Sequence, residues 1–347
     1  MYLVSAAHAS LILVAVVIAE KALIAQIRRR AGVKINPAVR IGMGDDCAIL
    51  RLPNVHGQQQ DTLVTTDFSL EGIHFRRAWH SPESVGHRCL TRGLSDIAAM
   101  GGQPVAAFLS LALPRDLPQS WVSRFTRGLM NLGEKYGVPL AGGDTAESPD
   151  GILADIIVVG AVPKGRAILR SGARPGDQIY VSGELGGSAG AVRLMQKNQR
   201  KKARLNPRDY PRHFFPEPRI ALGRVLRQKA LASAMIDTSD GLSTDLAHIC
   251  EESGVGAEIL ADAVPRASIG KPPREVDLDL ALHGGEDYEL LFTAPRSKRV
   301  PTQIAGVPIM QIGHITRFKK IFLMNRGEIG RELKPQGWEH FHKQWVP

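Results

Sequence analysis

Cysteine is scarce in this sequence, and its three cysteines lie far apart. Cys47, Cys89 and Cys250 form no CxxC pair, so no zinc-binding spacing is present. Three is also an odd number, which does not fit the disulfide framework of a secreted protein. We therefore expect a protein of a reducing compartment, the cytoplasm.

The common phosphate-binding motifs are missing as well. No GxxxxGK[ST] occurs, which excludes P-loop chemistry, and no HRDxxxxN with a DFG occurs, which excludes the protein-kinase signature. The glycines that follow residues 178–182 lack the GxGxxG spacing of dinucleotide-binding proteins. Any phosphate bound by this chain would be held by metals and loops.

Charged residues are absent from residues 1–19, which form an apolar extension. Its LILVAVVIA run brings the segment near the ~18 residues that a membrane-spanning helix needs. No positive region precedes the run, as a signal peptide would require, and Ser5, His8 and Ser10 weaken a membrane anchor. We expect no membrane association, although an anchor in residues 1–19 stays open beside an extension or a packed helix.

The positive charge is concentrated in one stretch. The chain has a net charge of +10, and residues 197–212 contain seven Lys or Arg and one Asp. This stretch is typical of a solvated insertion, because few aromatic residues interrupt it and no nucleic-acid-binding module surrounds it. We therefore expect no nucleic-acid partner.

Helices and strands alternate in the expected secondary structure, which indicates an α/β protein. Helical periodicity predicts helices over 20–31, 82–100, 118–136, 218–231 and 242–253. Apolar runs predict strands over 49–52, 63–66, 105–113, 152–162, 178–182, 235–236 and 289–293. A Gly- and Arg-containing stretch at 163–175 predicts a boundary between an N-terminal domain, 20–163, and a C-terminal domain, 164–347, which contains the insertion.

Clusters of acids, glycines and hydroxyl groups follow or open the apolar segments. The predicted strand at 63–66 leads to Thr65, Thr66 and Asp67, which offer the hard oxygen ligands that Mg²⁺ takes. Similar clusters recur at 44–46, 95–96, 142–145, 237–241 and 284–289. Carboxylates that converge from several elements repel one another unless cations neutralise them. Several divalent metal ions are therefore expected.

Single motifs have simpler interpretations. Asp240 is also suited to cap the helix that follows it, and Gly44-Asp45-Asp46 to form an ordinary turn. Asp96 lies on the apolar part of a helix, where an acid needs a partner or a metal. The paired glycines Gly142 and Gly143 expose backbone N–H groups that can hold a phosphate.

Together, these clusters resemble the thiamine-monophosphate kinase family, of the superfamily that includes aminoimidazole ribonucleotide synthetase and selenophosphate synthetase. Eight stretches match that family in order, from about residue 22 to residue 341: GDDCAIL, TTDFSLEGIHF, LSDIAAMGG, LAGGDT, GRAILRSGARPGD, IDTSDGLSTDLAHI, ALHGGEDYELLFT and GWEHF. The resemblance implies a two-domain α/β (α+β) fold like that of aminoimidazole ribonucleotide synthetase. Its N-terminal sheet domain joins a twin in a homodimer, and its C-terminal domain is α/β.

The resemblance also implies roles for individual residues. Its metal ligands match Asp46, Thr65, Thr66, Asp67, Asp96, Asp144, Asp237 and Asp240. Its ATP-binding positions match Gly143, Asp144, Arg170 and Ser239, and its thiamine-phosphate contacts match His74, Glu286 and Trp338. The expected catalytic residues are Asp67, Asp96, Asp144 and Asp240.

The implied reaction transfers the γ-phosphoryl group of ATP in line onto the phosphate of thiamine monophosphate, assisted by several Mg²⁺ ions. Both reactants are anionic, so positioning and charge neutralisation are the main tasks. Trp338 and Glu286 would supply an aromatic face and a carboxylate for the cationic substrate.

The chain departs from the family pattern at several places. Ala146-Glu147 replace a Thr-Arg pair, Gly93 replaces an Asn, and both residues 1–19 and the basic insertion lie outside the pattern. None of these departures changes a matched metal ligand.

Two alternative functions remain. An ATP-dependent synthetase of the same superfamily, such as one like aminoimidazole ribonucleotide synthetase, would share the acid clusters. A selenophosphate synthetase would need a reactive Cys or selenocysteine in a glycine-rich N-terminal segment, and the sequence has none. A basic nucleic-acid-binding protein would explain residues 197–212 and leave the acid clusters unexplained.

Overall fold

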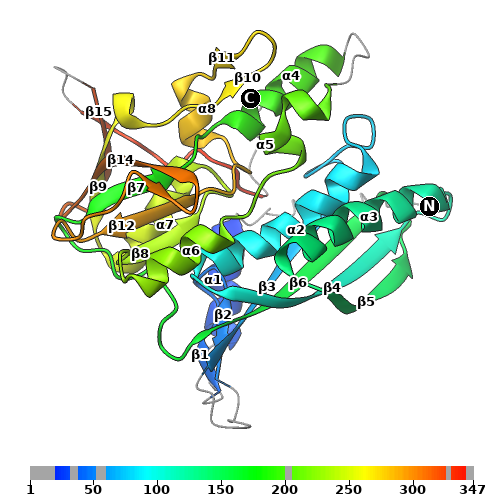
Figure 1. The fold of residues 1–347 in the computed structure, drawn as a ribbon, viewed down its shortest axis with the longest axis horizontal. Coiled ribbons are helices and arrows are strands. Elements are labelled where there is room, and N and C mark those ends of the chain that lie inside the picture. The colour runs from blue at the N-terminus through cyan, green and yellow to red at the C-terminus, as the bar shows by residue number, and fades with distance from the viewer. Residues whose placement is uncertain (1–19, 32–37, 52–59, 200–204, 326–329, 341–347) are drawn as a thin grey trace, which may run out of the picture.

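The structure, a computed structural model, describes residues 20–31, 38–51, 60–199, 205–325 and 330–340 (Figure 1). Within these residues, two large β-sheets and one two-stranded ribbon are accompanied by helices, which confirms the mixed α/β class. Helix α1 (Glu20–Ala31) precedes the first sheet, as predicted.

The first sheet has six strands in the order β1-β2-β3-β6-β4-β5. The strands are β1 (Val39–Ile41), β2 (Ala48–Leu50), β3 (Gln60–Leu70), β4 (Gln103–Leu113), β5 (Leu140–Glu147) and β6 (Leu153–Pro163). Neighbours pair antiparallel except β4 and β5, which are parallel. Helices α2 (Pro82–Ala99) and α3 (Gln119–Tyr136) lie over one face of this sheet (Figure 1).

The second sheet has eight strands in the order β16-β15-β9-β14-β7-β12-β8, with β13 paired to β14. Its strands are β7 (Gln178–Ser182), β8 (Ala234–Asp237), β9 (Gly256–Leu260), β12 (Leu290–Ala294), β13 (Gln303–Ile304), β14 (Val307–Thr316), β15 (Ile321–Met324) and β16 (Arg331–Glu332). Strands β10 (Ser268–Ile269) and β11 (Arg274–Glu275) form a separate ribbon.

The helices of this second half connect or flank its strands. They are α4 (Gly187–Gln199), α5 (Pro211–Phe214), α6 (Ile220–Gln228), α7 (Leu242–Ser253) and α8 (Leu278–His283), with short 3₁₀ turns η1 (Pro207–Asp209) and η2 (Ala261–Ala263). The prediction of α7 is confirmed to its end, where Gly254 adopts the left-handed conformation of a helix cap. Helix α8 and strands β13 to β16 were not predicted.

Helix α2 is buried on more than one side. Leu90, Leu94 and Ile97 are fully buried, and the helix contacts β3 and β6 of the first sheet as well as α6 and β8. Leu226 of α6 and Phe292 of β12 belong to the same hydrophobic core. This core therefore extends past the boundary expected near residues 163 and 164, and the proposed division of the chain into domains stays a prediction.

Strand β3 is longer than the sequence predicted. The predicted strand covered residues 63–66, whereas β3 continues to Leu70 because β6 pairs with it along its full length. Asp67 therefore lies inside a strand. Side chains alternate between the faces of a strand, so Thr65 and Asp67 lie on the face covered by α2, and Thr66 lies on the opposite face.

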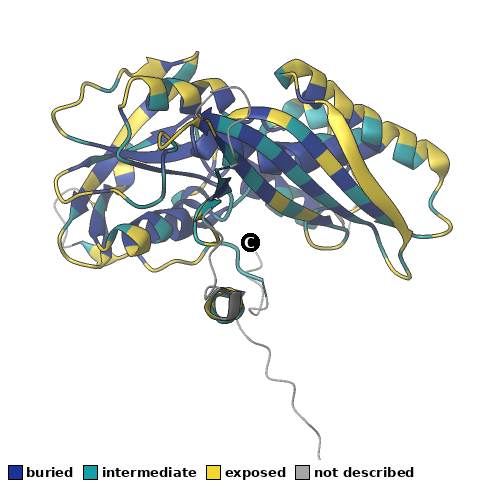
Figure 2. Ribbon diagram, turned by 90° about the horizontal axis from the view of Figure 1, so that it is seen from below, coloured by how far each residue is buried: buried dark blue, intermediate teal, exposed yellow. Residues whose placement is uncertain are grey.

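The Gly142–Thr145 stretch forms part of edge strand β5. This strand is exposed along its whole length, as Figure 2 shows. A Cβ atom on Gly143 would lie 1.8 Å from the carbonyl oxygen of Leu109, so glycine is what allows β5 to lie against β4.

Two predictions concern segments near the gaps in the described residues. Residues 1–19 lie outside the described part of the chain, and no helix among the described residues is long and apolar enough to cross a membrane. The basic insertion is described only in part, since residues 200–204 lie outside. Its last residue, Arg212, pairs with Glu184 at 2.9 Å and lies 3.5 Å from the buried Glu289, so this end of the insertion is packed against the protein.

We expect Gly86→Ala to destabilise the protein. Gly86 on α2 faces α3, and a Cβ atom there would lie 2.0 Å from the carbonyl oxygen of Phe125. The two helices would have to separate, and overpacking of this kind costs about 1–3 kcal/mol in the free energy of unfolding. Urea titration should show a lower midpoint for this variant. Gly42→Ala is the control, because a Cβ atom at Gly42 meets nothing within 4 Å; equal midpoints for both variants and the wild type would contradict the close packing of α2 on α3.

Candidate active site

Helix α2 carries the polar row around which the site is built. The helix begins at Ser81, whose Oγ accepts a hydrogen bond from the backbone N–H of Ser84 at 3.2 Å. Arg88, Arg92 and Asp96 follow at intervals of four residues, so they lie on one face of the helix. This face extends from the acid cluster at one end to Glu286 at the other.

The acid cluster consists of Asp46, Asp96 and Asp237. One oxygen of each carboxylate lies within 4.8 Å of the other two, and the residues come from the loop before β2, from α2 and from the end of β8. The sequence-predicted convergence of acids from different elements is therefore found for these three. Such a group of oxygen ligands is what a divalent cation takes.

Hydroxyl groups and one arginine hold the cluster in place. The hydroxyl of Thr65 donates a hydrogen bond to Asp96, and the hydroxyl of Ser95 donates one to Asp237 Oδ2 at 2.5 Å. Arg170 Nη2 lies 2.6 Å from Asp46 Oδ1. Arg170 was matched to an ATP-binding position; the structure places its guanidinium against this metal-ligand candidate.

The carboxylates are only partly compensated by these partners. Burial, together with the charges of Asp67 and Asp237, raises the pKa of Asp96 well above its ordinary value. Burial and the charge of Asp46 likewise raise the pKa of Asp237 to about 7. Asp46 Oδ2 is buried without a hydrogen-bond partner. An orphaned acceptor within repelling carboxylates fits a bound cation.

The other metal-ligand candidates lie on both faces of the first sheet and, in the case of Asp240, just after β8 of the second sheet. Asp67 lies beside Asp96, close enough to raise its pKa. Asp240, whose pKa burial raises to about 7, lies three residues beyond Asp237. Thr66 lies on the outer face, where its hydroxyl donates a hydrogen bond to Asp155 at 2.7 Å. Asp144 is exposed on β5, in register with Ser110 of β4.

Asp144 and Gly143 are thus not brought to the acid cluster within one chain. Ser110 also pairs with Asp155 of β6, and residues in register point to the same face of a sheet. Asp144 therefore lies on the outer face with Thr66. Their metal-binding and ATP-binding roles stay predictions.

Two of the three residues matched to thiamine-phosphate contacts, Glu286 and Trp338, lie beside the Asp237–Asp240 segment, and His74 is linked to Glu286 through Arg88. The backbone N–H of Glu286 donates to the carbonyl of Ser239 at 2.8 Å, and the backbone N–H of Trp338 donates to the carbonyl of Asp240 at 3.0 Å. The carbonyl of His74 accepts a hydrogen bond from Arg88 Nη2 at 3.3 Å. Ser239 is thereby held in the same place, through its backbone.

Glu286 is bound by two arginines. Its Oε2 lies 2.6 Å from Arg88 Nη2, and its Oε1 accepts a hydrogen bond from Arg92 Nη2. Burial alone would raise the pKa of Glu286, but Arg88 and Arg92 outweigh burial and lower it. Both carboxylate oxygens are therefore engaged before any substrate binds.

Arg88 and Arg92 were not among the residues predicted from the sequence. A usable signal was present, because both lie upstream of Asp96 at multiples of four residues on a predicted helix. Ser95 and Tyr288 were quoted only as parts of motifs, without roles.

Four buried side-chain atoms among the described residues have no hydrogen-bond partner, and all belong to this site. They are Asp46 Oδ2, Arg92 Nε, Tyr288 Oη and Trp338 Nε1. Buried polar atoms are otherwise nearly always paired. One acceptor and three donors are therefore available to ligands.

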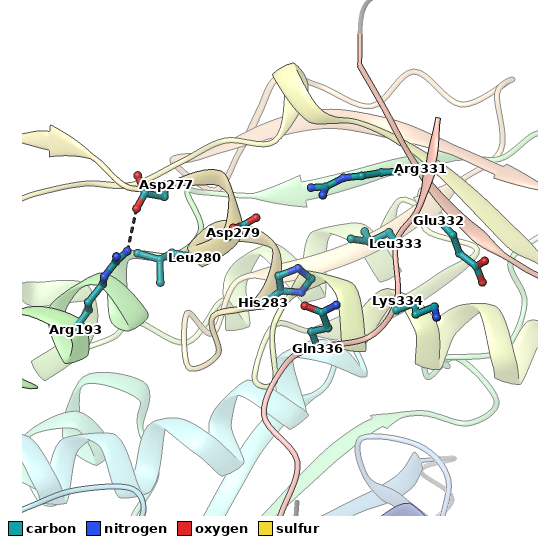
Figure 3. A pocket seen from close by; sticks show the side chains of 10 residues that line it. All are labelled: Arg193, Asp277, Asp279, Leu280, His283, Arg331, Glu332, Leu333, Lys334 and Gln336. Atoms are coloured by element: carbon teal, nitrogen blue, oxygen red, sulfur yellow. Dashed lines mark hydrogen bonds and ion pairs between the residues drawn. The ribbon is translucent and has the colours of Figure 1, made fainter. Parts of the chain in front are cut away.

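A separate pocket of about 450 Å³ lies on the second half of the chain (Figure 3). Arg193 and Asp277 form an ion pair at its rim, at 2.9 Å, and His283 and Gln336 also line it. None of the predicted site residues lines this pocket, so we assign the site from the acid cluster and its neighbours.

Comparison with known proteins places the chain in a family. The AIR synthase related protein family matches with its N-terminal domain over residues 44–162 and its C-terminal domain over residues 174–324. This match confirms the predicted two-domain fold.

Curated relatives are similar over most of their length. The thiamine-monophosphate kinase of Escherichia coli strain K12 is 38% identical over 315 residues, which cover 87% of this chain and 92% of that protein. The thiamine-monophosphate kinase of Bacillus subtilis strain 168 is 33% identical, over 88% of this chain and 94% of that protein.

A solved structure, AaThiL complexed with AMPPCP and TMP, is 32% identical and covers 93% of this chain and 97% of that chain, with a TM-score of 0.78. Sequence and structure agree over nearly the whole of both molecules. The chain therefore belongs to the thiamine-monophosphate kinase family.

Proposed function

We propose that this protein transfers the γ-phosphoryl group of ATP directly to the phosphate of thiamine monophosphate, which gives thiamine diphosphate. The observation that carries the proposal is the buried acid cluster on the same helix face as the Arg88–Glu286–Arg92 group. A site for cations that neutralise phosphates thus adjoins a site of positive charge. The 32% identical structure that holds AMPPCP, an ATP analogue, and TMP supports both substrates.

We propose Mg²⁺ as the cation, bound by several of the candidate ligands. Asp46, Asp67, Asp96, Asp237 and Asp240 would hold it on the side of the sheet covered by α2. When bound, Mg²⁺ neutralises phosphate oxygens and so reduces the repulsion between donor and acceptor. The protein's part is to position the two substrates for in-line attack.

No protein base is required in this reaction. The attacking oxygen belongs to a phosphate that is already ionised at neutral pH. His74 is poorly suited to take up a proton, because burial and the charge of Arg92 lower its pKa to about 3. This agrees with a site that is rich in Asp.

The alternative functions fit less well. A nucleic-acid-binding role would draw on residues 197–212, yet Arg212 pairs with Glu184 and Glu289. A different synthetase of the superfamily would need another acceptor beside the acid cluster. Assay with Mg-ATP and thiamine monophosphate, with detection of thiamine diphosphate, separates these possibilities.

We also propose that the protein is a cytoplasmic homodimer joined through the outer face of the first sheet. Phe68 and Phe108 are 54% and 37% exposed on this face, where large apolar side chains favour a partner surface. Cys47, Cys89 and Cys250 are buried free thiols, which suits a reducing compartment.

We expect Asp96→Asn to abolish activity without loss of stability. The change removes one ligand charge and lowers turnover by about 100-fold or more, while it relieves repulsion among buried carboxylates. Thiamine diphosphate production and the melting temperature without Mg²⁺ should be measured together. Asp116→Asn, at an exposed acid, is the control. Wild-type turnover of Asp96→Asn at limiting Mg²⁺ would refute the cation assignment.

Trp338→Ala should weaken thiamine monophosphate binding about tenfold and leave ATP binding unchanged. A cation over an aromatic face gains roughly 0.5–2 kcal/mol, and a tenfold change corresponds to about 1.4 kcal/mol. Calorimetric titration of each substrate tests this, with Phe318→Ala, at a 77% exposed ring, as the control. Equal losses for both substrates would assign Trp338 a packing role.

Phe68→Asp should raise the dissociation constant of the dimer at least about tenfold, because it places a charge in an apolar interface. Sedimentation equilibrium measures the change. Met130→Asp, at a 57% exposed residue of α3, is the control. If both variants dissociate alike, or if the wild type is a monomer, the outer face is not the interface.

A further inference from the structure

Arg92 lies in the middle of the active site, and not all of its hydrogen-bond donors have an acceptor. Its Nη2 donates to Glu286, and its buried Nε has no partner among the described residues. Asp96 lies one helical turn further along α2, so the guanidinium stands between Glu286 and the acid cluster. An unpaired donor of a charged side chain in this position is available to a ligand.

Arg88, by contrast, is fully engaged by the protein. Its Nη1 donates to the carbonyl of His213 at 2.6 Å, and its Nη2 contacts both Glu286 and the carbonyl of His74. One arginine is enough to neutralise one carboxylate. Arg92 is the second guanidinium on Glu286 and also interacts with the charge of Asp67, while its Nε has no acceptor.

Tyr288 supplies a second unused donor close to Arg92. Its side chain is 1% exposed, and its hydroxyl has no hydrogen-bond partner. Tyr288 lies two residues after Glu286, which accepts a hydrogen bond from Arg92, and both residues belong to the same hydrogen-bonded turn, so the hydroxyl and the guanidinium lie on the same side of the site. Two buried donor atoms without an acceptor, one of them on a guanidinium, fit an anion with several oxygens.

The backbone around Tyr288 is held in an uncommon conformation. Glu286 and Tyr288 have φ angles of 65° and 53°, in the left-handed region that non-glycine residues rarely occupy. Hydrogen bonds from their N–H groups to Ser239 and Thr238 fix this turn against the Asp237–Asp240 segment. Such strained conformations cluster at ligand-binding sites, which supports a ligand-binding role for Tyr288.

We propose that Arg92 and Tyr288 form an anion-binding subsite that takes the phosphate monoester of the acceptor substrate, with Glu286 and Arg88 as positioning residues. The proposal rests on the proposed function and deepens it. The acceptor is favoured over the γ-phosphate of ATP because Arg92 is tied to Glu286, and Arg88 ties Glu286 to His74, both matched to thiamine-phosphate contacts. In this arrangement Glu286 orients Arg88 and Arg92, and Trp338 contacts the cationic ring of the substrate.

Arg92→Gln should raise the KM for thiamine monophosphate about 10–100-fold, the range expected for one lost charge-assisted hydrogen bond in a buried site. The KM for ATP should stay within about twofold. Arg92→Lys keeps the charge and should fall between Arg92→Gln and the wild type. Tyr288→Phe should give a smaller rise, because it removes a neutral donor. Arg124→Gln, at an arginine of α3 that forms an ion pair with Glu83 of α2, is the control.

Binding of thiamine, which lacks the phosphate, separates the subsite from a general packing role. Calorimetry should show equal thiamine affinity for the wild type and Arg92→Gln, with only the phosphate ester weakened. An unchanged KM for thiamine monophosphate in folded Arg92→Gln would overturn the proposal. An equal loss for ATP or for thiamine would overturn it too, and would assign Arg92 to the donor or to the fold.

Inorganic phosphate distinguishes failure of this inference from failure of the proposed function. With Mg²⁺ present, phosphate should raise the melting temperature of the wild type and not that of Arg92→Gln. If the wild type makes no thiamine diphosphate but shows this difference, the subsite stands and the proposed reaction is wrong. If phosphate shifts both proteins equally or neither, the subsite is refuted, whatever the activity.

Discussion

The carboxylates of Asp46, Asp96 and Asp237 crowd into a buried space, and their mutual repulsion has to be offset for the chain to fold around them. Arg170, Thr65 and Ser95 offset part of it from three different elements. The rest of this repulsion is left for bound cations to offset. The positions of α2, β3 and β8 are therefore constrained by the need to hold the carboxylates where a cation can bind them.

The same logic operates at the other end of α2. A half-buried, ionised Glu286 would be costly alone, and Arg88 and Arg92 stabilise its ionised form. At this end two cations contact one anion, and Arg92 also interacts with the charge of Asp67. Arginine side chains thus lie one helical turn from the acid cluster, which suits substrates that carry both metal-bound and free phosphate oxygens.

Much of this could be predicted from the sequence because the signals were local. The periodicity of α2 and the glycines at its end gave the helix, and an acid on its apolar part indicated a partner for Asp96. The length of β3 could not be predicted, because pairing with β6, more than eighty residues away in the chain, overrides the polar residues that would otherwise end a strand. Periodicity of two could have placed Thr66 apart from Thr65 and Asp67, had the strand been extended.

Arg92 was missed for a different reason. On the sequence, an arginine on a helix is usually a solvated residue, and only the fold brings Glu286 and Tyr288 from the distant GGEDYE turn against it. Strands β13, β15 and β16 were missed because they are short, whereas β14 has ten residues and includes Pro308 and Gly313, residues that are uncommon in strands. The family motifs include Glu286 and Asp96 but not Arg92, so the family resemblance indicated the neighbours of Arg92 and not Arg92 itself.

The burial of α2 between early and late parts of the chain has a consequence for synthesis on the ribosome. One side of α2 is covered by β3 and β6, but the other side is covered only after α6, β8 and the core residues Leu290 and Phe292 have been synthesised. At a synthesis rate of about 5–20 residues per second, this interval lasts on the order of ten seconds or more. During that time the nascent chain presents an apolar helix surface with a row of unmatched charges, and the native topology becomes available only when the second half emerges.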